Sequence, residues 1–98
     1  MTRDRALQIL RDHEADFRAS GVAHLRLFGS VARDEAGPES DVDILADFDP
    51  TRPEAKFQIG TLQQDLEGML GVHVDLSVES WLKPLVRVEA LREQVYAF

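Results

Sequence analysis

The sequence predicts an α/β (α+β) fold in which helices pack on one face of a small mixed sheet. Segments with helical spacing of apolar residues alternate with short segments in which apolar and polar residues alternate strictly. Two of the strand-like segments are polar on one face, so helices cannot cover both sides and the second face should be open. The chain has 98 residues and neither repeats nor a linker, which fits one domain over residues 1–98.

The first half of the chain predicts one helix followed by two strands. Residues 3–19 carry apolar side chains at steps of three and four, and a glycine at position 21 can end this helix. Residues 22–28 resemble a strand, and the turn-forming residues 34–40 lead to a second strand over residues 42–48. One face of the second strand carries Val42, Ile44, Ala46 and Phe48, and the other carries Asp41, Asp43, Leu45, Asp47 and Asp49.

The second half predicts a helix, a third strand and a final helix. The helix starts at residues 51–53 and continues to Gly71 with apolar residues at helical spacing. Residues 72–78 form the third strand, which places Asp75 on its polar face together with His73. From about Pro84 onward a helical stripe contains Leu85, Val88, Leu91 and Val95.

Composition limits the classes of function. A net charge of -7 argues against stand-alone binding to DNA or RNA, but it suits a basic protein partner or bound divalent cations. The absence of cysteine excludes disulfides and thiolate metal sites. No apolar run approaches the roughly 20 residues that span a bilayer, so we expect no membrane association and a cytoplasmic location.

An Asp-x-Asp pair in the second strand predicts a metal site. Asp41 and Asp43 lie on the same side of the strand with α-carbons roughly 6.5 to 7 Å apart, and oxygen ligands of this kind suit Mg²⁺. Asp75 from the third strand would let a second Mg²⁺ bind about 4 Å away. Two such ions can stabilise the attacking and the leaving oxygen of a displacement at phosphorus.

A Gly-Ser pair after the first strand predicts a complementary anion site. If a short helix begins at Ser30, its free N–H groups can bind phosphate, and Gly29 allows a close approach to the backbone. Arg33, one turn later, could reach a phosphate oxygen. Alone, each motif is more often a solvated strand face or a capped turn. In this order and spacing they indicate nucleotidyl or phosphoryl transfer from a nucleoside triphosphate.

The motifs GSVAR, SDVD and VDL resemble those of the nucleotidyltransferase superfamily that includes DNA polymerase beta. More closely, the chain is similar to minimal nucleotidyltransferase (MNT) domains, the MntA-like antitoxins of HEPN/MNT toxin–antitoxin pairs. The segments RLFGSVARDEAGPESDVDILADF and VDLSVESWLKPLVRVEALREQVYAF fit that family and cover about half of the chain. The Gly-Ser pair and all three Asp positions match the pattern.

The resemblance implies a fold like the polymerase beta palm and roles for the site residues. Gly29 and Ser30 would grip the triphosphate, and Asp41 and Asp43 would bind Mg²⁺. Asp75 would bind the catalytic ion or help to deprotonate the acceptor hydroxyl.

Three cations are further candidates for phosphate contacts, although each could equally be a solvated surface charge: Arg33, Lys83 and Arg87.

The resemblance also implies a substrate and a partner. ATP would supply AMP to a tyrosine hydroxyl of a HEPN ribonuclease toxin, and the antitoxin would form a hetero-oligomer with that toxin. Two alternatives stay open. The chain could neutralise a toxin by binding alone, with vestigial catalysis, or it could modify a small molecule with help from a partner chain.

Overall fold

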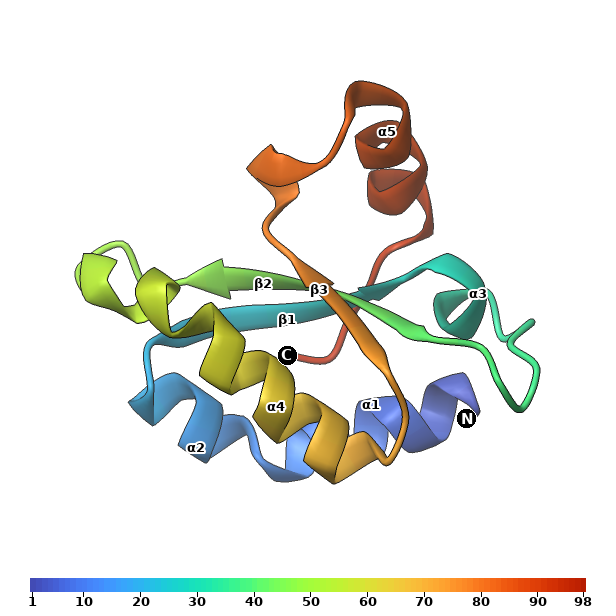
Figure 1. The fold of residues 1–98 in the computed structure, drawn as a ribbon, viewed down its shortest axis with the longest axis horizontal. Coiled ribbons are helices and arrows are strands. Elements are labelled where there is room, and N and C mark those ends of the chain that lie inside the picture. The colour runs from blue at the N-terminus through green and yellow to red at the C-terminus, as the bar shows by residue number, and fades with distance from the viewer.

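A four-stranded mixed sheet organises the protein, and the computed structural model describes it over residues 1–98. The strands are β1 (Val22–Phe28), β2 (Val42–Phe48), β3 (Val74–Ser77) and β4 (Val95–Tyr96). Their spatial order is β3-β2-β1-β4. β1 pairs antiparallel with β2 and with β4, whereas β2 and β3 run parallel (Figure 1). The predicted fold class is therefore confirmed.

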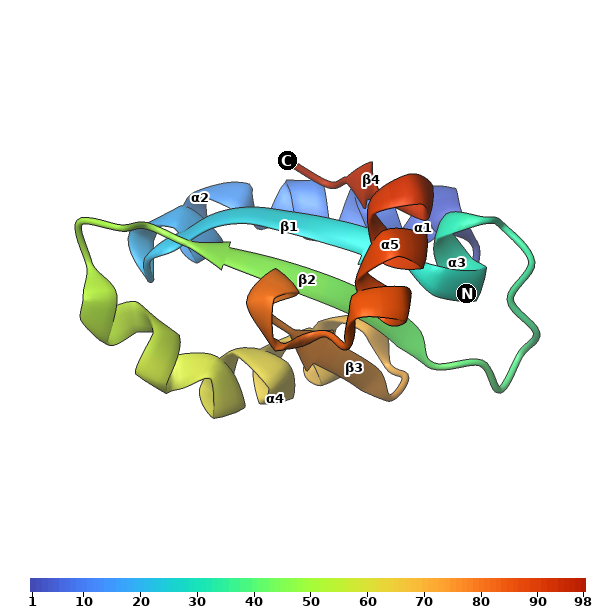
Figure 2. The ribbon, with the colours of Figure 1, turned by 90° about the horizontal axis from the view of Figure 1, so that it is seen from above.

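Helices lie on both sides of the sheet. Three of them cover one face: α1 (Arg3–Asp12), α2 (Glu14–Ala19) and α4 (Ile59–Leu70). The short α3 (Gly29–Ala32) follows β1 directly, and α5 (Pro84–Glu93) rises from the opposite face (Figures 1 and 2). Two 3₁₀ helices, η1 (Pro53–Gln58) and η2 (Glu79–Trp81), precede α4 and α5 respectively. None of the helices has the length and hydrophobicity that crossing a bilayer requires.

The hydrophobic core lies between the sheet and the three helices on its first face. The alternation predicted for β2 is confirmed, because Val42, Ile44 and Ala46 are fully buried in this core. Leu45 points to the other face and is nevertheless fully buried. The prediction of an open second face is therefore wrong in part, since η2 packs against β2 and α5 packs against β1 there.

The predicted helix over residues 3–19 is divided at His13 into α1 and α2. The ring nitrogen Nδ1 of His13 lies 2.9 Å from the carbonyl oxygen of Ile9, the acceptor that the helical N–H of residue 13 would use. That N–H bonds instead to the carbonyl of Leu10. The side chain thus competes with the backbone, while the apolar stripe continues through Phe17.

The C-terminal prediction needs a larger correction. The helix α5 ends at Glu93, and Val95 belongs to β4 rather than to the helical stripe. The side chains of the stripe are largely exposed, at 82% for Leu85 and 52% for Val88, and Ala90 is the residue that α5 buries. β3 is also shorter than the predicted residues 72–78, because η2 follows it closely.

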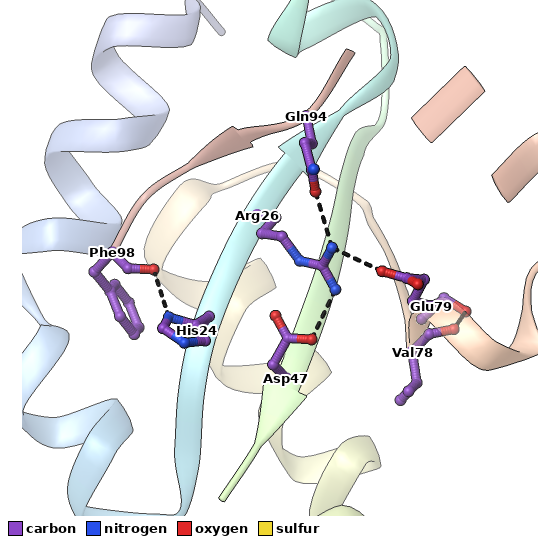
Figure 3. Close-up of polar contacts among 8 residues, drawn as sticks. His24, Arg26, Asp47, Val78, Glu79, Gln94 and Phe98 are labelled. Atoms are coloured by element: carbon purple, nitrogen blue, oxygen red, sulfur yellow. Dashed lines mark hydrogen bonds and ion pairs between the residues drawn. The ribbon is translucent and has the colours of Figure 1, made fainter. Parts of the chain in front are cut away.

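Polar contacts of Arg26 attach the segment of η2 and α5 to the sheet (Figure 3). This guanidinium group on β1 is only 4% exposed and binds Asp47 of β2 at 2.7 Å. It also donates to Glu79 at 2.9 Å and to Gln94 at 2.8 Å. Burial disfavours the charged guanidinium, but the hydrogen bonds to Glu79 and Asp47 outweigh it and raise the pKa of Arg26. The alternation of apolar and polar residues along the sequence did not predict this network.

We expect Arg26→Met to lower the free energy of unfolding by about 2–3 kcal/mol. The variant leaves the carboxylates of Asp47 and Glu79 without their cation, and their partial solvent exposure keeps the loss below that of a fully buried pair. Urea denaturation measures the difference. Arg92→Met, which removes an exposed pair with Glu89, is the matched control and should change stability by less than about 0.5 kcal/mol. Equal losses of stability in Arg26→Met and Arg92→Met would contradict the role of Arg26 in attaching η2 and α5 to the sheet.

Candidate functional site

The sheet brings the three predicted carboxylates together. Parallel pairing of β2 with β3 places Asp43 directly beside Asp75, and Asp41 immediately precedes β2. Carboxylate oxygens of Asp41 and Asp75 and a ring nitrogen of His73 all lie within 4.8 Å of one another. Asp41 and Asp75 are exposed, whereas Asp43 is partly buried. This close group contains His73 in place of Asp43, which lies beside Asp75, so the predicted set of three Asp ligands stays a prediction.

His73 shares this face, as its place in the strand pattern predicted. Its Nδ1 lies 3.4 Å from Oδ2 of Asp41, and its Nε2 lies 3.8 Å from Oε2 of Glu67. Glu67 on α4 also accepts a hydrogen bond from the backbone N–H of Val74 at 3.1 Å. The ring of His73 therefore lies between two carboxylates, where it can orient Asp41.

Partial burial and nearby negative charge together raise the pKa of Asp43 to about 6. Partial burial is the main cause, and the neighbouring carboxylates of Asp75 and Asp41 add to it, whereas Arg33 opposes it. A divalent cation would relieve this repulsion, and the ligands offered are the carboxylate oxygens that Mg²⁺ prefers. The residues present therefore fit a magnesium site.

Gly29 joins the acidic group to the predicted anion site. Its backbone has φ of +72°, a conformation that favours glycine, and a Cβ at this position would collide with Oδ2 of Asp43. The antiparallel register pairs the preceding residue, Phe28, with Asp43. The missing side chain of Gly29 thus lets the acidic strand lie against the start of α3, which begins at Gly29 rather than at Ser30.

The predicted anion site binds a carboxylate of the same chain. The backbone N–H of Gly29 donates to Oε2 of Glu93 at 3.2 Å, and Nη1 of Arg33 donates to Oε1 of the same residue at 2.7 Å. Nε of Arg33 donates to Glu35 at 3.1 Å. Ser30 lies partly exposed beside them. Sequence patterns gave no indication of Glu93, because it lies on a helix remote from the Gly-Ser motif.

The two other candidate cations are placed differently. Arg87 donates from Nη2 to the backbone carbonyl of Ser80 at 3.4 Å, which ties α5 to η2. Lys83 is exposed at the start of α5. Neither side chain contacts the acidic group, so the local cation at the anion site is Arg33.

Comparisons with known proteins agree with this geometry. The nucleotidyltransferase domain family matches residues 4–97. Protein adenylyltransferase MntA of Thermococcus cleftensis is 40% identical over 97 residues, covering 98% of this chain and 96% of that relative. A solved structure of a candidate minimal nucleotidyltransferase has a TM-score of 0.75 at 36% identity and covers 97% of this chain and 95% of its own.

A toxin–antitoxin crystal structure with AMP-PNP shares the fold, with a TM-score of 0.62 at 20% identity. The match covers 100% of this chain and 73% of the other. The chain therefore belongs to the nucleotidyltransferase domain family, and it is a nucleotidyltransferase. The family predicted from the Gly-Ser and Asp-x-Asp motifs is confirmed.

Gly29→Ala should destabilise the protein by about 2 kcal/mol, because alanine is strained at this φ and its methyl group meets Asp43. The same collision should displace Asp43 and reduce nucleotidyl transfer. Gly68→Ala in α4 is the control, since nothing lies within 4 Å of the added methyl and helix propensity predicts a gain of up to about 1 kcal/mol. Urea titration measures the free energy of unfolding of both variants. A Gly29→Ala variant as stable as wild type would contradict the described contact with Asp43.

Asp43→Asn should stabilise the metal-free protein above pH 6. In the wild type the folded pKa of about 6 exceeds the unfolded value near 3.9, so stability falls as pH rises between these values and stays reduced above them. Asparagine does not ionise, and its advantage should vanish by about pH 4. Thermal melts in EDTA at several pH values measure this.

Asp65→Asn, an exposed position on α4, is the control and should show no such pH dependence. Millimolar Mg²⁺ should raise the melting temperature of the wild type more than that of Asp43→Asn. A stability difference that is independent of pH would contradict the charge crowding at Asp43.

Proposed function

We propose that this nucleotidyltransferase is a Mg²⁺-dependent protein adenylyltransferase that transfers AMP from ATP to a tyrosine hydroxyl of a HEPN ribonuclease toxin. The observation that carries the proposal is the convergence of Asp41, Asp43 and Asp75 beside Gly29. The adenylyltransferase named as such in Thermococcus cleftensis supports ATP as donor and a protein as acceptor, because it matches over nearly the whole chain.

The proposed reaction is one displacement at phosphorus. The acceptor oxygen bonds to the α-phosphorus of ATP, the bond to the β-phosphate oxygen breaks, and pyrophosphate leaves. Asp75 would take the proton of the acceptor hydroxyl, or would hold an ion that makes this hydroxyl easier to deprotonate. Bound Mg²⁺, in our proposal two ions held by Asp41, Asp43 and Asp75, would neutralise charge on the phosphates.

The chain's own residues would position the donor. The backbone N–H of Gly29, which donates to Glu93 in this structure, would donate to a phosphate oxygen instead, and the hydroxyl of Ser30 would add a donor. Arg33 supplies the positive charge. Rate enhancement then comes from alignment of the reacting atoms and from electrostatic stabilisation.

Exposed apolar side chains beside the site favour a protein acceptor. Leu85 and Val88 of α5 and Trp81 of η2 are each more than half exposed. The helix α5 lies on the face of the sheet opposite α1, α2 and α4 (Figure 1), where the alternation along β2 places Asp41 and Asp43. Apolar surface with an exposed tryptophan is typical of a partner contact. The net charge of -7 favours a basic partner, and a hetero-oligomer with the toxin would bring the acceptor hydroxyl to the site.

The same exposed surface also supports the alternative of neutralisation by binding alone. In that case the carboxylates would be dispensable for protection from the toxin. An ATP-dependent site in a chain without cysteine fits a cytoplasmic location for either mechanism.

Transfer of label from α-labelled ATP to the toxin tests the proposal. We expect wild type with Mg²⁺ to label a HEPN-domain toxin. Asp41→Ala/Asp43→Ala and Asp75→Asn should lower the rate at least about 100-fold, as loss of a metal site or proton acceptor does. Asp65→Asn is the matched control and should keep wild-type activity. If the double mutant neutralises the toxin fully and wild type transfers no label, binding alone explains the function.

A further inference from the structure

The carboxylate of Glu93 uses the hydrogen-bond donors that the proposed function assigns to phosphate. We propose that Glu93 is an internal competitor for the nucleotide, and that a triphosphate entering the anion site displaces it and loosens the C-terminal end of α5. This inference rests on the proposed function, because it concerns the regulation of the same site.

Both oxygens of Glu93 are engaged. Oε1 accepts from Nη1 of Arg33 at 2.7 Å, and Oε2 accepts from the backbone N–H of Gly29 at 3.2 Å. The side chain is only 18% exposed, compared with 42% for Arg33, so the contact is sheltered from water on the side of Glu93. A carboxylate oxygen and a phosphate oxygen accept the same hydrogen bonds, and the backbone N–H of Gly29 cannot serve both in this geometry.

Charge makes the competition unfavourable for Glu93 once a triphosphate is present. The phosphates would lie between Arg33 and the acidic residues of β2 and β3, and a second carboxylate at the same donors would repel them. Bound Mg²⁺ compensates the charge of Asp41 and Asp43 but does not restore the two donors to Glu93. Binding of the nucleotide therefore requires the Glu93 side chain to move away from Gly29 and Arg33. The free energy of this displacement lowers the apparent affinity for the nucleotide.

Beyond Glu93 the chain is fixed by the pairing of β4 with β1, whereas the last turn of α5 itself has few other contacts. The helix buries Ala90, and packs against α3 and β1, while its apolar stripe stays exposed. Arg26 binds Gln94 just beyond the helix end and Glu79 before the helix start. Loss of the Glu93 contact thus removes the direct polar link between α5 and α3. The apolar surface of α5 would respond to nucleotide, which couples the phosphate site to the surface where a partner would dock.

The affinity for ATP tests the first half of the proposal. Glu93→Gln keeps the shape of the side chain but removes its charge, so it should bind Mg²⁺–ATP about tenfold more tightly than wild type, measured by calorimetry without acceptor. Glu89→Gln, one turn earlier on the same face of α5, removes the same charge from the groove that Arg33 and Glu93 line, without the hydrogen bonds that Glu93 accepts. It should bind within about twofold of wild type, which separates the hydrogen bonds of Glu93 from the effect of a nearby negative charge.

The fluorescence of Trp81 tests the second half, since it is the only tryptophan and Arg87 links α5 to the adjoining Ser80. Addition of inorganic tripolyphosphate or Mg²⁺–ATP should change the emission of wild type. Glu93→Gln should show part of that change before any ligand is added, and its melting temperature reports whether it remains folded. Glu93→Asp retains the charge on a shorter side chain. Its affinity for Mg²⁺–ATP should lie between those of wild type and Glu93→Gln.

Unchanged or weaker binding by Glu93→Gln, relative to Glu89→Gln, would overturn the competition while leaving the proposed function intact. Tighter binding with no change at Trp81 would overturn the coupling to α5. Absence of ATP binding by wild type and every variant would overturn both this inference and the proposed function.

Discussion

The contact between Gly29 and the carboxylate of Asp43 is the constraint on which the site depends. Antiparallel pairing of β1 with β2 brings the end of one strand against the acidic start of the other, and parallel pairing with β3 adds Asp75. Only a residue without a side chain allows the start of α3 and the carboxylate of Asp43 to lie in contact. The residues to which we assign phosphate and metal binding are therefore held side by side by backbone geometry.

The segment of η2 and α5 is attached mainly by charged groups. Arg26 joins Asp47, Glu79 and Gln94 across three elements, and Glu93 joins α5 to α3. Contacts of this kind depend strongly on geometry and on local charge, whereas apolar packing tolerates small displacements. The position of α5 thus depends more on nearby charge than the positions of the helices that pack through apolar side chains do.

Local patterns in the sequence predict the parts of the structure that alternate cleanly. The strands β1 and β2 and the meeting of Asp41, Asp43 and Asp75 follow from period-two alternation and from the Gly-Ser and Asp-x-Asp spacing. The stripe of α5 is misleading, because helical periodicity does not reveal whether the stripe faces the core or solvent. β4 forms because β1 has a free edge, and Arg26 and Glu93 meet partners that are distant in the sequence, so neither follows from local pattern.

Closure of the sheet by β4 has a consequence for biosynthesis. The backbone N–H of Ala97 donates to Leu25 at 2.8 Å, and Arg11 donates to the carbonyl of Ala97 at 2.7 Å across 86 residues of sequence. A ribosome must therefore release almost the whole domain before the edge of β1 can be covered and α5 can settle over the site. Until then β1 is paired with β2 on one side only, and its other edge stays exposed.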